Sequence, residues 1–495
     1  MATVDKIIVT NKSALRKKYG VNFSLVENSL ANFIAADAAR GMTTKLVYLD
    51  DATVKKYGAV PVRSASNGHQ NKDTVDKIFR YFKPDYLLLL GARDVVPHIK
   101  LTNLTNDEDG TIIDSDLPYA SDYGYSRDGR NFLAPTRVIG RVPDITGGRD
   151  HTYLTRLIDN IAGTQKLKRK DYADWLAVTA KEWIASSSVS VANIFSSTSG
   201  LLISPPAKGP YPQLNQTRVH FFNCHGGLRD SRFYGQDGDD YPVAFSSAFL
   251  DKKLKPGTFV AAECCYGAEL FDQAQGQDMS ISNKYLLQNA VAYVGSTTVA
   301  YGPTEGQGGA DLITQYFVIN VLKGYSTGRA FLEARQKFIN VSGPRIDAVE
   351  LKTIMQFLLL GDPSLHLVDH ERTTTVFAKG KLRYVSESEI NAYRKARRKQ
   401  LYENGNRVGD STELPKRKTV KISAGRHKLF SPLVRQLGFR DFSSVAFSFG
   451  NKKTGNEKHY FYLEKKHAGR KKHHPRILVF KETGDDIIVR LYERK

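Results

Sequence analysis

The chain contains 495 residues, of which 41% are hydrophobic, and it carries a formal net charge of +21. This length suits two or three domains, and the composition is that of a soluble protein without a transmembrane segment. The first ten residues lack the basic region and apolar core of a signal peptide, and the three cysteines, an odd number, offer no disulfide framework. These features predict a cytoplasmic protein.

Three units are predicted along the chain. Residues 1–165 have the pattern of an α/β subdomain, which the basic segment 165–170 joins to a catalytic subdomain at residues 166–372. Residues 373–495 form the third unit. No internal repeat and no long low-complexity tract interrupts this order.

Two apolar runs in the catalytic subdomain each end in a chemically reactive residue. The first, residues 218–227, ends in His225 followed by glycine, and the second, residues 257–267, carries Cys264 and Cys265. Short β-prone runs that break into glycine are typical of buried strands in an α/β sheet, whose carboxyl edge holds the chemistry of such enzymes. An imidazole beside a thiol at this edge predicts nucleophilic catalysis, because histidine can take the proton of a thiol that is only slightly ionised at neutral pH.

The same residues admit two other interpretations. Cysteine is among the most buried residue types, so both thiols would fit an ordinary core. A zinc site could use Cys224, His225, Cys264 and Cys265, but structural zinc sites usually separate their ligands by two to four residues. Each pair here is adjacent, so its side chains diverge, and we predict no metal at these positions.

The residues around the two runs resemble the gingipain family of the caspase-like clan of cysteine peptidases. In that clan one strand ends in His-Gly, and a later strand ends in an acidic residue or glutamine, a small residue and the nucleophile; here these are His225-Gly226 and Glu263-Cys264-Cys265. Further segments that resemble the family are residues 85–91, 114–125, 136–143, 294–298 and 360–365. The resemblance implies an α/β fold with a caspase/gingipain-like sheet flanked by helices, in two α/β subdomains.

The resemblance also implies the roles of individual residues in a cysteine endopeptidase. Cys265 would attack the scissile carbonyl, and His225 would protonate the leaving amine. The amides of Cys265 and Gly226 would hold the oxyanion. Glu182 follows a Trp-Leu pair, loosely as in gingipains, and would orient the imidazole, although a solvated glutamate fits the sequence equally well.

Two thiols compete for the role of nucleophile. Side chains alternate along a strand, so Glu263 and Cys265 share one face and Cys264 lies on the other. An acidic residue two positions before the nucleophile, as in metacaspases and legumain, matches Cys265. Gingipains instead place glycine three residues after the cysteine, and Gly267 stands in this relation to Cys264. We favour Cys265 and keep Cys264 as the alternative.

Three residues are predicted to bind substrate. Glu263 would favour Arg or Lys before the scissile bond, because a desolvated carboxylate pairs with a basic side chain. Ser296 begins another pocket wall, in which Tyr301 stands where the family places a tryptophan. Residues 186–193 contain no acid, unlike the corresponding stretch of arginine-cleaving gingipains. The chemistry requires no cofactor, and calcium is possible by family resemblance only.

The carboxy-terminal unit carries nearly all of the basic charge. From Glu371 to Lys495 there are 31 Lys and Arg against 13 Asp and Glu, a balance of +18. The densest basic runs are residues 394–399, 416–418 and 467–474, and β-prone segments lie between them. We predict a small, basic, strand-rich accessory domain at residues 373–495, outside the catalytic sheet. Its surface would suit nucleic acid, an anionic membrane surface or an acidic partner, or would serve solubility alone.

The predicted function is cleavage of protein substrates after a basic residue. The alternative is a protease fold without turnover, which recruits nucleic acid or an acidic partner through residues 373–495. The presence of both His225 and Cys265 favours the enzyme. The sequence predicts no particular oligomeric state.

Overall fold

The computed structural model of the chain describes two ranges. The first is residues 4–369, except 106, 273–277, 304–305 and 343–345, and the second is residues 416–494, except 438, 440–441, 452–454, 465–475 and 484–485. The basic runs at residues 394–399 and 467–474 lie outside the described residues, whereas residues 416–418 begin a strand.

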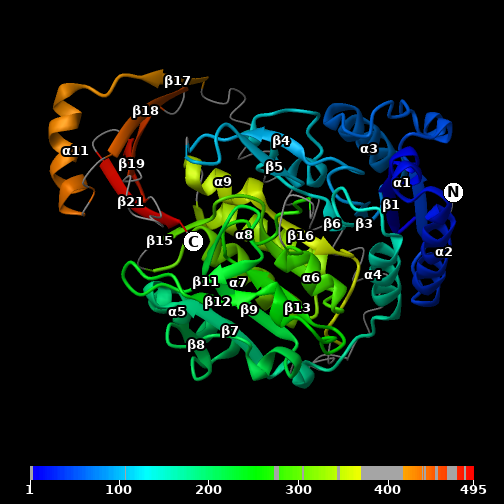
Figure 1. Cartoon of the computed structure of the whole chain (residues 1–495). Coiled ribbons are helices and arrows are strands. Elements are labelled where there is room, and N and C mark those ends of the chain that lie inside the picture. Colours follow the sequence, from blue (N-terminus) through cyan, green and yellow to red (C-terminus); the bar gives the residue numbers. More distant parts are fainter. Residues whose placement is uncertain are drawn as a thin grey trace, which may run out of the picture.

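A ten-stranded sheet runs through both predicted α/β subdomains (Figure 1). Its central strands are mostly apolar and are buried along their whole length, as expected for a sheet covered by helices on both faces. From one edge to the other the strands are β2 (Thr44–Tyr48), β1 (Lys6–Thr10), β3 (Tyr86–Leu90), β6 (Val138–Val142), β16 (Phe357–Gly361), β14 (Ala292–Ser296), β13 (Phe259–Ala262), β9 (Val219–Asn223), β7 (Trp175–Ala180) and β8 (Leu201–Ser204).

The ten strands form two parallel blocks that run in opposite directions. The first block is β2, β1, β3, β6 and β16, the second is β14, β13, β9, β7 and β8, and they meet in the antiparallel pair β14–β16. The carboxyl ends of the second block therefore lie at the same edge as the amino ends of the first. Residues that follow β9, β13 and β14 consequently meet residues that precede β16.

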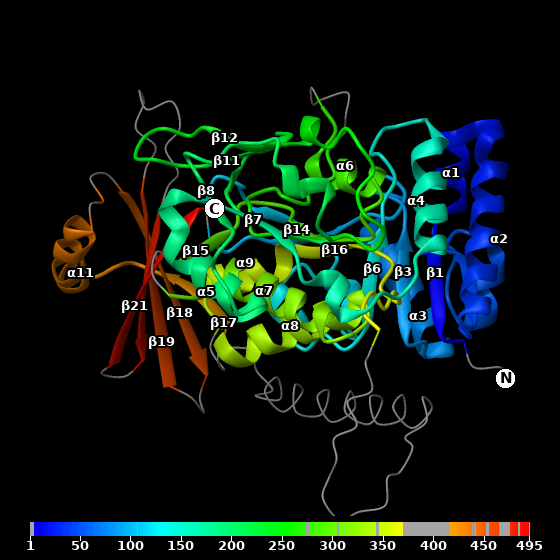
Figure 2. The ribbon, with the colours of Figure 1, turned by 90° about the horizontal axis from the view of Figure 1, so that it is seen from below.

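Helices cover both faces of this sheet (Figure 2). On one face, α7 (Ala310–Leu322) packs on β13 and β14 of the second block, and α8 (Thr327–Ser342) packs on β6 and β16 of the first. α6 (Ile281–Leu287) lies on the other face, against β14. α9 (Ala348–Gln356) begins with a capping box between Asp347 and Glu350, and β16 follows it directly. The other helices of this part are α1 (Lys12–Tyr19), α2 (Phe23–Ala39), α3 (Gly68–Phe82), α4 (His151–Gly163) and α5 (Ile184–Phe195).

Two smaller antiparallel units accompany the main sheet. One contains β10 (His225–Gly226), β11 (Arg232–Tyr234) and β12 (Val243–Ser246). The other is the hairpin of β4 (Ile99–Thr102) and β5 (Ile112–Ser115). β5 packs against α9, so the hairpin of the amino-terminal part lies beside the helix that precedes β16.

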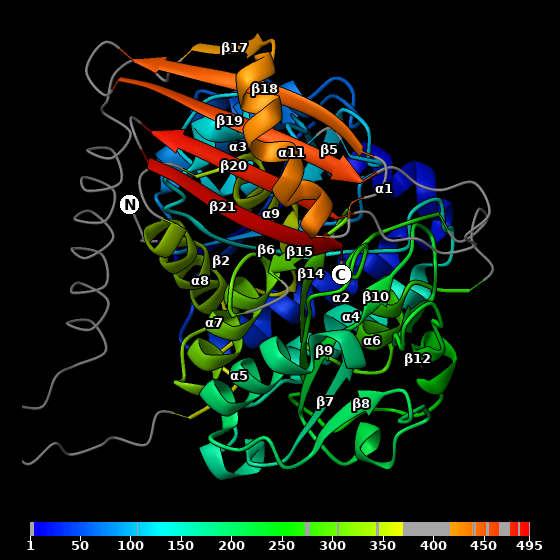
Figure 3. The ribbon, with the colours of Figure 1, turned by 90° about the vertical axis from the view of Figure 1, so that its left-hand side faces the viewer.

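The carboxy-terminal part forms a second, six-stranded antiparallel sheet. Its order is β15 (Tyr301–Pro303), β21 (Asp486–Arg494), β20 (Ile477–Thr483), β19 (Gly455–Glu464), β18 (Phe442–Asn451) and β17 (Lys416–Val420). Helix α11 (Ala424–Gln436) crosses the outer face of this sheet (Figure 3). The first strand of this sheet, β15, comes from the middle of the chain.

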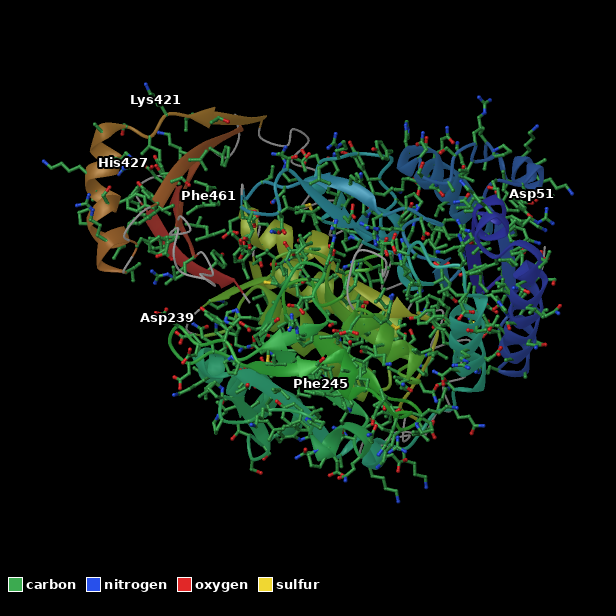
Figure 4. The ribbon with its side chains drawn as sticks, viewed as in Figure 1. Asp51, Asp239, Phe245, Lys421, His427 and Phe461 are labelled. Atoms are coloured by element: carbon green, nitrogen blue, oxygen red, sulfur yellow. The ribbon has the colours of Figure 1, made fainter. Side chains whose placement is uncertain are left out.

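Both faces of the six-stranded sheet are covered. Tyr460 and Phe480 pack against Phe430 of α11, with ring centroids 5.0 and 4.1 Å from the Phe430 ring. Phe461, on the opposite face, is fully buried and belongs to the main hydrophobic core (Figure 4). The alternating pattern of β19 therefore places one face against α11 and the other against the catalytic part.

The predicted α/β fold, a large sheet flanked by helices with a strand-rich unit after it, is confirmed. The predicted domain boundaries stay predictions. Residues 301–303 lie inside the predicted catalytic subdomain but pair with the carboxy-terminal sheet. In the ranges that the structure describes, no helix has the length and apolar character needed to cross a membrane.

Candidate active site

The two apolar runs form neighbouring parallel strands, β9 and β13. Their register pairs Ala262 with Phe222, so both strands end at nearly the same level. Cys224 and His225 follow β9, and Glu263, Cys264 and Cys265 follow β13. The topology thus brings the predicted reactive residues to one edge of the sheet.

The backbones of Gly226 and Cys265 are in close contact. A Cβ atom placed on Gly226 would lie 1.8 Å from the carbonyl oxygen of Cys265 and 2.9 Å from its carbonyl carbon. No side chain fits there without moving the backbone, so this position requires glycine. The contact holds the segment of His225 against the segment of Cys265.

The imidazole of His225 is buried and held from three sides. Its Nε2 lies 2.6 Å from Oε1 of Gln236, and the rings of Trp183 and Tyr241 lie 4.3 and 5.1 Å from its ring centroid. The Gln236 amide donates from Nε2 to the carbonyl of Gly238 at 3.2 Å, which fixes Oε1 toward the histidine. Because an amide oxygen only accepts, His225 carries a proton on Nε2 in this arrangement.

Glu182 lies in a short 3₁₀ turn, Lys181–Trp183, and its side chain is exposed. Its neighbour Trp183 is the residue of this turn that packs on the His225 ring. The orienting role predicted for Glu182 stays a prediction, while Gln236 makes the hydrogen bond described above.

The thiol of Cys265 is fully buried and contacts the backbone of Ala300. The Ala300 N–H donates to Sγ at 3.3 Å, and Sγ lies 3.5 Å from the Ala300 carbonyl oxygen. Burial raises the pKa of the Cys265 thiol well above its ordinary value, and the carboxylate of Asp109 adds to this, while the Ala300 N–H opposes it. The thiol is therefore neutral in this structure, and its attack on a carbonyl needs a base that takes its proton.

Cys264 lies in different surroundings. Its Sγ is 3.9 Å from the carbonyl oxygen of Phe222 on β9, and Cys224 is its neighbour. Burial, followed by the hydrogen bond with Cys224, raises the pKa of the Cys264 thiol well above its ordinary value. The Cys264 thiol thus faces β9 of the sheet, whereas the Cys265 thiol faces the Ala300 segment.

The three predicted substrate-binding residues are all buried. Glu263 accepts a hydrogen bond from Oγ1 of Thr314 on α7 at 2.9 Å. Ser296 donates to the carbonyl oxygens of Cys264 and Thr298, each at 2.9 Å, and so ties the Cys264 loop to the end of β14. The Tyr301 hydroxyl points to Asp107, at 2.8 Å.

A buried carboxylate, Asp109, joins the segments on both sides of the Cys265 thiol. Its Oδ1 accepts from the Tyr266 hydroxyl at 2.5 Å, and its Oδ2 accepts from the Val299 N–H at 3.0 Å. Tyr266 adopts a left-handed conformation with φ of +54°, which is strained for a residue with a side chain. Asp109 therefore fixes the residue after Cys265 and the residue before Ala300; we call this arrangement the Asp109 clamp.

The ammonium group of Lys352 on α9 neutralises the clamp. It pairs with Asp109 and lies 2.5 Å from Asp107, and all three side chains are at most 3% exposed. A bound cation would find this acidic pair already occupied by Lys352. Among the residues that the structure describes, no three His, Cys, Asp or Glu side chains are arranged to hold a metal ion. The calcium that the family resemblance makes possible stays a prediction.

Gln236, Trp183, Tyr241 and the Asp109 clamp were not predicted from the sequence. Residues 106–110, Asn-Asp-Glu-Asp-Gly, carry only the signal of a turn. The contacts of Asp109 with Tyr266 and Val299 depend on the hairpin of β4 and β5, which is distant from both residues in sequence.

Comparison with known proteins agrees with this geometry. Residues 219–368, which contain His225 and Cys265, match the family model described as Peptidase family C25, the gingipain family. The predicted resemblance to the gingipain family is confirmed. The match supports a cysteine peptidase.

One solved structure, described as "Structure of Protease", aligns with 100% of this chain and 98% of its own, at 12% sequence identity and a TM-score of 0.47. No curated protein matches the chain.

Proposed function

We propose that this C25-like chain is an endopeptidase in which Cys265 is the nucleophile and His225 the general acid and base. The contact between Gly226 and the Cys265 backbone carries the proposal, because it sets an imidazole-bearing segment against a thiol-bearing segment. The position of both residues inside the matched range 219–368 supports it further.

In the proposed mechanism, the Cys265 sulfur forms a bond to the scissile carbonyl carbon while its proton passes to His225. The backbone N–H groups of Gly226 and Cys265 stabilise the negative oxygen that develops. His225 then gives its proton to the leaving amine, and the C–N bond breaks. Water hydrolyses the resulting thioester with His225 as base and restores the thiol.

Glu263 supports a preference for Arg or Lys before the scissile bond. Its carboxylate is fully buried one residue before the Cys264-Cys265 pair, where a basic side chain would remain its best partner. A cytoplasmic location is part of the proposal, supported by three free cysteines, as is polyanion binding by the basic carboxy-terminal domain.

The test is hydrolysis of fluorogenic peptides by single variants. Cys265→Ala and His225→Ala should each abolish turnover, because nucleophile and base act as one unit. Cys264→Ala is the matched control, since it removes the adjacent buried thiol, and it should keep most of the activity. A dead Cys264→Ala beside an active Cys265→Ala would move the nucleophile to Cys264. Activity in both variants would show that neither Cys264 nor Cys265 is the nucleophile.

A further inference from the structure

The strand β15 connects the candidate active site to the carboxy-terminal sheet. It begins directly after Ala300, whose backbone contacts the Cys265 thiol. β21 pairs with it antiparallel, with Arg494 opposite Tyr301 and Tyr492 opposite Pro303. The carboxyl end of β21 is therefore the end nearest to Cys265.

An edge strand beside a peptidase nucleophile is a natural place for an extended peptide. Such a peptide binds by adding a strand to the edge, because unpaired N–H and C=O groups of the edge match its own backbone. A peptide lying antiparallel on β15 would run with its carboxyl end toward Cys265. Its scissile bond would then follow the residues that face β15, within reach of the thiol. β21 takes one of the two edges of β15 in this direction, so a peptide that used this edge would have to displace it.

The hold of β21 on the catalytic part is local. Its pairing with β20 covers Asp486–Tyr492, and within the described residues its pairing with β15 joins residues 301–303 to residues 492–494. The side chain of Tyr492 anchors it: the ring is 3% exposed within the main core, and its hydroxyl donates to Oδ2 of Asp347 at 2.6 Å. So short a pairing, among the residues that the structure describes, can open while the rest of the sheet stays folded.

We propose that β21 occupies the edge of β15 that an extended peptide substrate would use, so that the carboxy-terminal domain and the substrate compete for it. This inference rests on the proposed peptidase function. It makes the carboxy-terminal domain a restraint on the active site and not merely a surface for targeting. Substrates or partners that pull β21 away from β15 would raise activity.

The test compares two tyrosine variants of the full chain. Tyr492→Phe removes the hydroxyl that holds β21 to Asp347. Tyr460→Phe is its matched control, because the Tyr460 hydroxyl donates to Glu482 at 2.6 Å within the six-stranded sheet and contacts neither β15 nor α9. Each is assayed on a tetrapeptide substrate, which needs β15, and on a single-residue amide, which does not.

Competition predicts that Tyr492→Phe raises kcat/KM on the tetrapeptide roughly tenfold, mainly through a lower KM, because a hydrogen bond to a buried carboxylate favours the paired state by about this factor. The single-residue amide should change less than about twofold, and Tyr460→Phe should behave as wild type on both substrates. A peptidyl electrophile bound at Cys265 should also speed hydrogen exchange of the amides of residues 486–494, but not of β18.

Two results would overturn the inference. Lower or unchanged tetrapeptide turnover by Tyr492→Phe, with slow exchange of β21 while the inhibitor is bound, would make β21 a permanent brace of the site. Absence of turnover and of inhibitor labelling in every variant would instead refute the proposed function, and the competition with it. The first result occurs in an active enzyme and the second does not, so the two failures are distinguishable.

Discussion

The two sheets of this molecule build their environments in different ways. The ten-stranded sheet has short, largely apolar central strands, and the reactive residues follow where β9 and β13 end. In the six-stranded sheet, strands β18 to β21 are longer, and one face of the sheet packs on α11 and the other on the catalytic part. The ten-stranded sheet holds the candidate site residues at one of its edges, whereas the six-stranded sheet packs against the outside of that part of the chain.

The difference shows where control of the site can arise. The catalytic edge is completed by two elements from elsewhere in the chain: the Asp109 clamp from the amino-terminal part, and β21 from the carboxy-terminal sheet, which covers β15. The clamp is buried and fixed by charge, whereas β21 is held by a short pairing. We therefore expect changes in the clamp to damage catalysis and changes in the second sheet to adjust access.

The largest effect is expected at the buried carboxylate beside the reactive thiols. Glu263→Gln should lower kcat/KM on Arg or Lys substrates by roughly ten- to a thousandfold, since a desolvated charge partner is worth a few kcal/mol. A fluorogenic library that varies only the residue before the scissile bond measures this. Glu333→Gln, on the partly buried outer side of α8, is the control and should keep the preference. An unchanged preference in Glu263→Gln would place the specificity acid elsewhere.

The Asp109 clamp gives the next effect. Asp109→Asn keeps the shape of the side chain but loses one of its two acceptor oxygens, so kcat should fall by roughly tenfold to a hundredfold with little change in KM. Because the Asp109 carboxylate raises the pKa of Cys265, its removal should at the same time speed alkylation of that thiol by iodoacetamide.

A lower kcat together with faster alkylation would distinguish a loss of thiol positioning from general unfolding, which would not produce this pair of changes. The control is Asp50→Asn, which loses a similar contact to the backbone N–H groups of Lys12 and Ser13, far from the site. Asp50→Asn should change neither kcat nor the rate at which iodoacetamide alkylates Cys265. Normal kcat in Asp109→Asn would show that the clamp does not position the thiol.

A smaller effect is expected for polyanion binding by the second sheet. Replacing Lys416, Arg417 and Lys418 by glutamine should weaken binding of single-stranded nucleic acid by roughly tenfold, and binding should fall with salt as counterions are displaced. The matched change of three exposed lysines, Lys55, Lys56 and Lys77, to glutamine should have little effect. Fluorescence anisotropy measures the affinity for nucleic acid. Equal losses of affinity in both variants would show that binding depends only on the net charge of the protein and not on residues 416–418.

The smallest effect concerns stability and pH. Glu269 accepts the N–H of Arg229 at 2.8 Å and so joins the loop after His225 to the loop after Cys265. Burial raises its pKa to about 7, against the opposing influence of that N–H, Arg93 and Arg229, with Asp109 adding to the rise. A carboxyl whose pKa is raised on folding favours the folded state below its unfolded pKa, and this contribution is lost as pH rises through about 7.

Glu269→Gln should therefore have a higher free energy of unfolding than wild type at pH ~8, on the order of 2 kcal/mol, and about the same value at pH ~4. Urea unfolding at the two pH values measures the difference. Glu333→Gln again serves as control, and its difference from wild type should not grow between them. A constant difference for Glu269→Gln would show that folding does not shift the pKa of Glu269.

Sequence patterns predicted the catalytic half of the fold well, because its strands are continuous apolar runs that end in glycine or reactive residues. The same patterns placed His225 and Cys265 at one edge, since parallel neighbours such as β9 and β13 end together. Gln236 and Asp109 were not predicted because both lie in loops, and the position of a loop depends on contacts between residues far apart in sequence. The pairing of β15 with β21 is of the same kind: residues 301–303 are too short to signal a strand until β21 lies beside them.

The most direct measurement of the central claim is to map the residue that reacts with a peptidyl electrophile. The full-length protein is treated with a peptidyl ketone carrying a basic residue next to the reactive carbon, digested and analysed by mass spectrometry. We predict a single adduct on Cys265, formed at least roughly a hundredfold more slowly in His225→Ala because the base is missing. An adduct on Cys264 or Cys224, or one on Cys265 that forms equally fast without His225, would contradict the account.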